Sequence, residues 1–365
     1  MNFWQTLRQQ KKPFFCVAPM ADVTDAAFRR LIAKYSRHGE HGGGPDVTWT
    51  EFVSANGLMS PGREVLQRDL VYSEMERPIV AQLFSSDPEK MEGAAYLAAT
   101  LGFDGIDINM GCPDKTIEKQ GAGAAMIKTP EIAASIIEAV KKGIKRAGKD
   151  IPVSVKTRVG YNQVQIDEWI PFLLKQNIAA LSVHARIRKD LSKVPANWEY
   201  LKKVVVLRDK IAPDTVVIGN GDVTSIADGK QKAKLSGCDG VMVGRALFGN
   251  PWFFDEDREV VAAIPKKMPA FIRKIPILKN IFDTRRKLPQ SAKNPITIKE
   301  RLNVLVEHTK LFGELLGDIK SFSIMKKHYK AYCTGFHGSK ELRIKLMETK
   351  NSSEVEAIIK EFLIQ

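Results

Sequence analysis

GIDINM (residues 105–110), EIAASIIEAVKKGIKRA (131–147) and VSVKTRV (153–159) follow one another in the chain and decide its fold class. The first and third stretches are short and mostly apolar, as expected for parallel strands that are covered on both faces. The second repeats apolar residues at helical spacing, and Thr129 with Pro130 before it is typical of an N-cap and first turn. These stretches therefore predict a strand, a helix and a second, parallel strand.

The same alternation extends in both directions along the chain. Six more strand-like runs are FFCVAPM (14–20), VTWTEFV (47–53), IVAQLF (79–84), ALSVHARI (180–187), VVIGNG (216–221) and GVMVGR (240–245). Eight strands that alternate with helices over about 250 residues predict a (β/α)8 TIM barrel. A doubly wound open sheet is the alternative, which is disfavoured because no G-x-G-x-x-G motif opens the first strand–helix turn.

Composition narrows the class of protein. The 365 residues are 44% hydrophobic and 27% charged, which is typical of a soluble globular protein. The four cysteines are scattered without a C-x-x-C pair, so neither a zinc site nor a disulfide framework is expected. We find no signal-peptide pattern and no run of about 20 apolar residues. The sequence therefore predicts a cytoplasmic protein without a membrane span or a metal site.

The chain changes character after the eighth predicted strand. We predict a catalytic barrel over residues 1–255, a basic linker over 256–297 and a small all-helical domain over 298–365, with Ser352 capping the last helix. Residues 266–330 hold 16 basic and five acidic residues, so +11 of the net charge of +14 lies there. Such a concentration suits a polyanionic partner such as nucleic acid, although a solvated helix face is the alternative.

Polar residues gather where the predicted strands end, which is where function is found in this type of barrel. Each buried polar group without a partner would cost about 1–3 kcal/mol, so a bound cofactor is expected there. Glycines at 219, 221 and 244, together with Arg245, predict a site for its phosphate. Lys156 and His184 lie on neighbouring strands and are expected to face its ring.

Several motifs, in this order, resemble those of the tRNA-dihydrouridine synthases. They are APMADVTD (18–25), AQLF (81–84), NMGCP (109–113), GAGAAM (121–126), VKTRVG (155–160), VHAR (183–186), GNGDV (219–223) and GVMVGRALFGNPW (240–252). In addition, MKKHYKAYCTGFHGSKELR (325–343) resembles the helical domain of that family. The resemblance implies an FMN-bearing barrel, a helical tRNA-binding domain, and reduction of tRNA uridine to 5,6-dihydrouridine with NADPH as reductant. We also expect a monomer. One departure is HAR at 184–186, where many relatives have HGR.

The resemblance also assigns roles to individual residues. It makes Cys112 the catalytic proton donor. It implies that FMN is bound by Pro19, Met20, Ala21, Gln82, Lys156, His184, Asn220, Gly221, Asp222, Gly244 and Arg245. It implies that the tRNA substrate is contacted by Asn109, Arg158, Arg186, Lys326 and Lys327.

The chemistry of uracil reduction fits a cysteine at position 112. Hydride delivered to C6 leaves a carbanion at C5, which an acid must quench. A thiol with an ordinary pKa near ~8.5 is protonated at neutral pH and able to give up its proton. A covalent nucleophile is the competing role, but no activating base lies beside Cys112 in the sequence. We expect Cys16, Cys238 and Cys333 to be small buried apolar residues.

The sequence leaves two other functions open. One is an FMN barrel that acts on a small pyrimidine-like metabolite, as dihydroorotate dehydrogenase-like enzymes do. The other is an RNA-binding protein that uses the barrel only as a scaffold. The charge of residues 266–330 favours tRNA as the substrate, since a small-molecule enzyme has no need of it. A uridine in tRNA would also have to leave the base stack to reach the mouth of the barrel.

Overall fold

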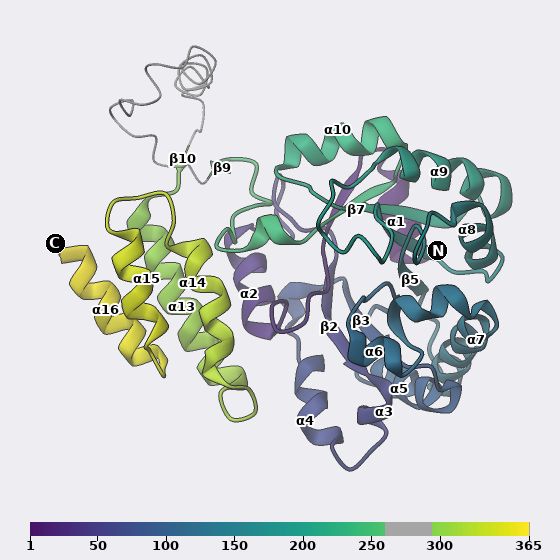
Figure 1. Cartoon of the computed structure of the whole chain (residues 1–365), viewed down its shortest axis with the longest axis horizontal. Coiled ribbons are helices and arrows are strands. Elements are labelled where there is room, and N and C mark those ends of the chain that lie inside the picture. Colours follow the sequence, from purple (N-terminus) through teal and green to yellow (C-terminus); the bar gives the residue numbers. More distant parts are fainter. Residues whose placement is uncertain (260–293, 365) are drawn as a thin grey trace. The chain divides into compact units, whose positions relative to one another are not determined.

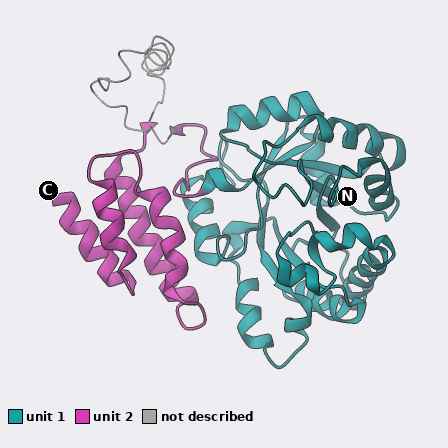
Figure 2. Ribbon diagram, viewed as in Figure 1, with its two compact units in different colours: residues 1–247 teal, residues 248–365 magenta. Residues whose placement is uncertain are grey.

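Eight parallel strands form the centre of the first part of the chain. In the computed structural model, which describes residues 1–259 and 294–364, residues 1–247 and 248–365 make two compact units (Figure 2). The strands of the first unit are β1 (Phe14–Val17), β2 (Thr48–Ser54), β3 (Ile79–Phe84), β4 (Gly105–Met110), β5 (Val153–Arg158), β6 (Ala180–His184), β7 (Val216–Asn220) and β8 (Gly240–Val243). All eight predicted strands are thereby confirmed.

The sheet curls round and closes. Its strands pair in the order β1-β8-β7-β6-β5-β4-β3-β2, each with a parallel neighbour. Cys16 of β1 forms a parallel bridge with Val47, next to β2, and the Val17 N–H donates to the Val47 carbonyl at 3.1 Å. The fold is therefore the predicted (β/α)8 barrel, and the open-sheet alternative is wrong.

Helices and short turns connect the strands on the outside of the barrel (Figure 1). Asp87 caps α5, since its carboxylate accepts the N–H groups of Glu89 and Lys90. Thr129 stands before α7 as predicted, but its side chain makes no capping hydrogen bond. The helical segments are α1 (Phe3–Gln9), α2 (Ala26–Tyr35), α3 (Ala55–Leu58), α4 (Arg63–Gln67), η1 (Arg68–Leu70), η2 (Glu74–Glu76), α5 (Pro88–Thr100), α6 (Lys115–Lys119), η3 (Gly123–Lys128), α7 (Pro130–Arg146), α8 (Ile166–Leu174), α9 (Glu199–Ile211), α10 (Ile226–Ser236) and η4 (Arg245–Leu247).

Alternation along the strands divides the core into two layers. In β4, Ile106 and Ile108 belong to the apolar layer that also contains residues of α5 and α7. A second apolar cluster joins Trp4 of α1 to Phe14 and Trp49 of the strands. The other face of β4 carries Asp107 and Asn109, both buried. The alternation therefore places polar groups on the face of β4 opposite the helices.

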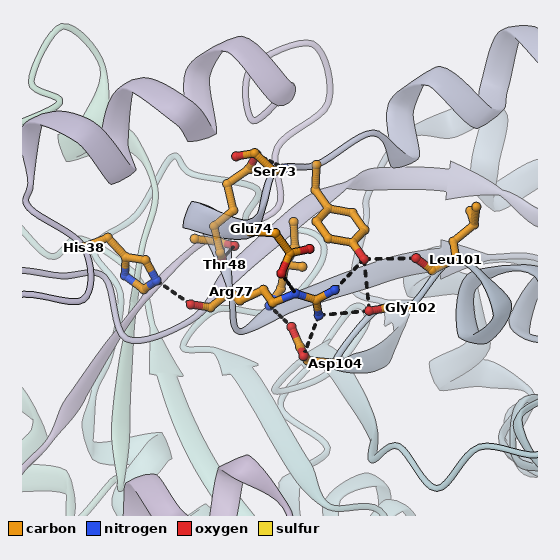
Figure 3. A network of polar contacts seen from close by, with 11 residues as sticks. His38, Thr48, Ser73, Glu74, Arg77, Leu101, Gly102 and Asp104 are labelled. Carbon is orange, nitrogen blue, oxygen red and sulfur yellow. Dashed lines mark hydrogen bonds and ion pairs between the residues drawn. The ribbon is translucent and has the colours of Figure 1, made fainter.

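A polar network ties together the segments that lead into β2, β3 and β4 (Figure 3). The Arg77 guanidinium donates to Glu74, Asp104, the Gly102 carbonyl and the Tyr72 hydroxyl. His38 Nε2 is 2.5 Å from the Arg77 carbonyl oxygen, which anchors the Gly-rich segment 38–46. This network lies at the strand beginnings, so it stabilises the barrel at the end opposite the strand C-termini.

The second unit is helical, as predicted for the C-terminal part. Two residue pairs, β9 (Arg258–Glu259) and β10 (Asn294–Pro295), precede α13 (Ile298–Leu316), η5 (Phe322–Met325), α14 (Lys326–Tyr332), α15 (Ser339–Met347) and α16 (Ser352–Ile364). Thr297 and Glu300 form a capping box at the start of α13. The predicted cap of the last helix is wrong: Ser352 is its first residue, and Asn351 Oδ1 accepts the Glu354 N–H at 3.0 Å.

Part of the predicted basic linker, residues 260–293, lies outside the described residues. The division into segments 1–255, 256–297 and 298–365 stays a prediction. Within residues 1–259 and 294–364, none of the helices has the length and apolar character that crossing a bilayer requires.

Candidate active site

A cavity of about 840 Å³ opens at the C-terminal ends of the barrel strands. Its size is that of sites for drug-sized ligands and cofactors. Residues that follow β7 and β8 form part of its wall, which is where barrels of this kind often bind phosphate. Of the predicted site residues, it is lined by Pro19, Met20, Lys156, Arg158, His184, Arg186, Asn220, Gly221, Asp222, Gly244 and Arg245.

Lys156 supplies a cation within this cavity. Its ammonium is 3.4 Å from Asn220 Oδ1, and the Asn220 amide nitrogen donates to the Met242 carbonyl at 2.8 Å. Burial, and after it the charge of Arg158, lowers the pKa of Lys156, while Asp107 opposes the shift; the resulting pKa is about 8. Lys156 is therefore charged at neutral pH and loses its proton at a mildly alkaline pH.

His184 is a neutral hydrogen-bond donor in this site. Its Nε2 is 2.9 Å from Arg186 Nη1. Because a guanidinium only donates, Nε2 must accept, and the ring proton must be on Nδ1. Burial and then the charges of Arg158 and Lys156 lower the pKa of His184 far below its usual value, which keeps the ring uncharged. Within the described parts of the chain, no residue accepts the Nδ1 proton, so it is available to a ligand.

Asp222 joins two of the cavity arginines. Its carboxylate pairs with Arg186 and with Arg245, and accepts the Ala196 N–H at 2.8 Å. Partial burial raises the pKa of Asp222, but these hydrogen bonds, led by that of Arg186, outweigh it and keep the pKa below its usual value. Arg186 is 3% exposed, whereas the Arg245 side chain is 63% exposed. Arg245 is thus the member of this group with most freedom to meet an anion.

Arg158 supports the backbone that carries Cys112. Its Nε donates to the Gly111 carbonyl at 2.8 Å, and its Nη1 lies 3.3 Å from the Ile187 and Leu191 carbonyls. Gly111 packs tightly against β5: a Cβ there would lie 3.2 Å from backbone atoms of Thr157. Arg158 therefore ties the segment after β4 to the segment after β6.

The Cys112 segment is fixed on several sides. Asn109 Oδ1 accepts the N–H groups of Gly111 and Cys112 at 3.1 and 2.9 Å. The Cys112 carbonyl accepts the Ala124 N–H at 2.9 Å. Gly123 has φ +63°, and a Cβ there would lie only 2.7 Å from the Cys112 oxygen. The small residues of the GAGAAM motif therefore let η3 close over the cysteine.

The thiol of Cys112 is protonated at neutral pH. Burial raises its pKa above the usual value, although the charges of Arg158 and Lys156 act in the opposite direction. The residue is partly exposed, and Pro113 beside it lines the cavity. Cys16, Cys238 and Cys333 are buried, as expected. The structure thus singles out Cys112 as the partly accessible cysteine among the four.

Sequence reasoning missed Asp107 and Ser154. Asp107 is fully buried; its Oδ2 accepts from Gln82 Nε2 and its Oδ1 from Ser154 Oγ, both at 2.6 Å. Gln82 Oε1 in turn accepts from Asn109 Nδ2 at 3.0 Å. A signal was present, since Asp107 stands two positions before Asn109 in an apolar strand and so shares its face.

The remaining predicted residues lie elsewhere. Gln82 and Asn109 are buried in the barrel and do not line the cavity, and Ala21 is exposed in the segment after β1. Lys326 and Lys327 begin α14 in the second unit.

Gly219 packs against Trp198, since a Cβ at this position would lie 2.5 Å from the Trp198 ring. Its expected approach to a phosphate stays a prediction.

The donors of the cavity fit a flavin mononucleotide. Four cations, Lys156, Arg158, Arg186 and Arg245, face one carboxylate, Asp222, which gives the cavity the positive charge that a phosphate requires. The Nδ1 proton of His184 and the ammonium of Lys156 suit the carbonyl oxygens and ring nitrogens of an isoalloxazine.

Comparison with known proteins gives a consistent result. The family model described as dihydrouridine synthase (Dus) matches residues 16–364. A probable tRNA-dihydrouridine synthase of Staphylococcus aureus (strain MRSA252) is 36% identical over 367 residues, which covers 100% of this chain and 96% of that protein. Probable tRNA-dihydrouridine synthase 2 of Bacillus subtilis (strain 168) is 36% identical over 364 residues, with coverage of 99% and 96%.

Solved structures align less well. A complex of 2-naphthoyl-CoA reductase has a TM-score of 0.47 at 10% identity, and the alignment covers 65% of this chain and 48% of that one. A likeness at this level carries no argument about function.

Proposed function

The chain belongs to the dihydrouridine synthase family, and from this premise we propose that it reduces uridine in tRNA to 5,6-dihydrouridine with FMN as cofactor and NADPH as reductant. One observation supports the proposal most: a protonated thiol, Cys112, is held next to a cation-lined cavity large enough for a flavin. The alternative of a small pyrimidine-like substrate lacks such support, because the similar proteins are named for tRNA.

The residues of the cavity would bind and orient the flavin. Arg245 would meet the phosphate, with Gly221 and Gly244 as neighbours in the cavity wall. Lys156 and the Nδ1 proton of His184 would meet polar atoms of the ring, where a cation stabilises added negative charge. When bound, reduced FMN supplies the hydride for C6 of uracil.

Cys112 would supply the proton for C5. In this role the S–H bond breaks, the proton moves to C5, and the thiolate is later reprotonated from solvent. The raised pKa of the thiol favours an acid over a thiolate nucleophile. Lys156 and Arg158, whose charges act on the Cys112 thiol, would stabilise the thiolate after the transfer.

The proposal is tested with purified protein, FMN, NADPH and an unmodified tRNA transcript or tRNA from cells that lack dihydrouridine. We expect dihydrouridine, measured by mass spectrometry of the digested tRNA, to accumulate with an equal amount of oxidised NADPH. Oxidation of NADPH without dihydrouridine on either tRNA would contradict the proposed substrate.

We also propose that the helical unit contributes to tRNA binding through Lys326 and Lys327, which begin α14. Replacing both with glutamine should weaken tRNA binding several-fold at low salt. The slope of log Kd against log salt should fall by about one to two, because each lost phosphate contact removes roughly one released counterion. Filter binding between 50 and about 200 mM salt measures this slope.

Lys345, which pairs with Glu361, provides the control variant Lys345→Gln. An unchanged slope in the double variant would contradict a phosphate contact.

A further inference from the structure

A buried chain of hydrogen bonds runs from the middle of the barrel to the Cys112 segment. Ser154 Oγ donates to Asp107, and Gln82 Nε2 donates to the other carboxylate oxygen, both at 2.6 Å. Asn109 Nδ2 donates to Gln82 Oε1 at 3.0 Å, and Asn109 Oδ1 accepts the N–H groups of residues 111 and 112. The side chains of β3, β4 and β5 thus connect Asp107 to the backbone of Cys112.

The hydrogen bonds at both ends of this series can run in one direction only. An ionised carboxylate only accepts, so the amide nitrogen of Gln82 must face Asp107. The backbone N–H groups only donate, so the amide oxygen of Asn109 must face them. The two amides between these ends, those of Gln82 and Asn109, can satisfy both conditions in a single orientation. A reversal of either amide would bring two donors or two acceptors together in a buried place, which costs about 1–3 kcal/mol.

The burial of these residues strengthens the argument. Asp107 and Gln82 have no exposed surface, and Asn109 is 5% exposed, so water does not readily replace a lost partner. Burial raises the pKa of Asp107, and the hydrogen bonds of Ser154 and Gln82 and the charge of Lys156 oppose this shift. The resulting pKa is about 6, so most of the group is ionised at neutral pH.

We propose that Asp107 is a positioning residue for the reaction: through Gln82 it sets the orientation of the Asn109 amide, whose oxygen holds the Cys112 backbone. Asp107 itself does not line the cavity. It acts through two amides that it holds in one orientation, and the thiol is thereby held at a fixed place beside the flavin site. The inference rests on the proposed function only in giving the thiol its role in catalysis.

Variants that exchange the carboxylate at position 107 with the amide at position 109 test the direction of these hydrogen bonds. Asn109→Asp keeps an acceptor for the backbone N–H groups but places a second acceptor against Gln82 Oε1. Gln82 cannot escape by rotating, because its oxygen would then face the Asp107 carboxylate. In the double variant Asp107→Asn/Asn109→Asp, a rotated Gln82 accepts from position 107 and donates to position 109. The two bonds of Gln82 are thus restored in the opposite direction, while Ser154 and the backbone N–H groups still donate as before. Asp107→Asn alone keeps an oxygen for Gln82 and should be mild.

Three readouts are compared for these variants. The first is the rate of Cys112 alkylation by iodoacetamide, measured by peptide mass spectrometry. We expect Asn109→Asp to raise it about 10-fold and the double variant to return it to within about threefold of the parent protein, because a loosened segment exposes the thiol. The melting temperature should follow the same order. In the third readout, the tRNA-dependent step should fall by about 10²-fold in Asn109→Asp, as for a small misplacement of a reacting group.

The outcomes distinguish a directed chain of hydrogen bonds from a general loss of stability. A double variant as impaired as Asn109→Asp, or an Asn109→Asp variant equal to the parent, would overturn the proposed direction. If Asn109→Asp does not fold, recovery of folding in the double variant supports the proposal, and failure of both overturns it. Asp239→Asn, a carboxylate bonded to Arg8 and Arg208 next to β8, is the control for lost stability at the other end of the barrel. If the parent protein makes no dihydrouridine, the proposed function fails, but alkylation and melting still decide the role of Asp107.

Discussion

Cys112→Ala is expected to lower the rate of dihydrouridine formation by a factor of about 10² to 10⁴, the usual contribution of a general acid. Flavin content and NADPH-driven flavin reduction should stay close to those of the parent protein. The reason is geometric, because Cys112 lies on the segment after β4, held by Asn109 and Arg158, while the cavity itself is lined by other residues. Rapid-mixing measurements of flavin reduction and of its reoxidation by tRNA separate the two steps.

Two further variants make the Cys112 result specific. Cys238→Ala removes a buried thiol whose pKa burial raises to about 12, and it should leave both steps unchanged. Cys112→Ser keeps a weak proton donor and should fall between the parent protein and Cys112→Ala. Reoxidation by tRNA at the parent rate in Cys112→Ala would show that the proton comes from another group.

Lys156→Met is expected to weaken flavin binding about 10- to 100-fold, since a hydrogen bond to a charged group contributes about 1.5–3 kcal/mol. The same ammonium gives the parent protein a pH dependence. Because the pKa of Lys156 is lowered to about 8, the affinity for the flavin should fall as pH rises through about 8 and above. Titration of the cofactor-free protein with FMN between pH 6.5 and 9.5 (roughly one and a half units on each side) measures both effects.

Stability should change in the opposite direction over this pH range. The folded protein releases the Lys156 proton near pH 8, whereas the unfolded chain holds it until about pH 10.5. Unfolding therefore takes up a proton in this interval, and the contribution of Lys156 to the free energy of unfolding rises with pH.

Lys156→Met should remove the pH dependence of flavin affinity and that of stability. Lys203→Met, which removes a surface lysine paired with Asp167, is the control. A flavin affinity independent of pH in the parent protein would contradict a role for the Lys156 charge.

The sequence predicted the barrel well because its signals are local and repeated. The runs at 79–84 and 105–110 are strands over the same residues in the structure. Strand ends in a parallel barrel meet at one edge, so Lys156, His184 and Arg245 could be placed together before their distances were known. The local signals are weaker for the last helix, where Asn351 and Ser352 both favour an N-cap and only the backbone decides between them.

The connections within the site required the structure. Arg158 and Arg186 were predicted to contact tRNA, but their guanidinium groups bind the carbonyls of Gly111 and Val194, and Arg186 also binds Asp222. Their contact with tRNA stays a prediction. The series of hydrogen bonds from Asp107 to the Cys112 backbone depends on which side chains of three strands meet at the same height in the barrel. That height is set by strand register, which residue types alone do not specify.

The most direct test of the proposed function maps dihydrouridine in tRNA from cells with and without the gene. We expect at least one tRNA position to lose dihydrouridine when the gene is deleted. The parent gene should restore it, and a gene carrying Cys112→Ala should not. Identical maps with and without the gene, in a cell where no other dihydrouridine synthase acts on the same position, would contradict the proposed function.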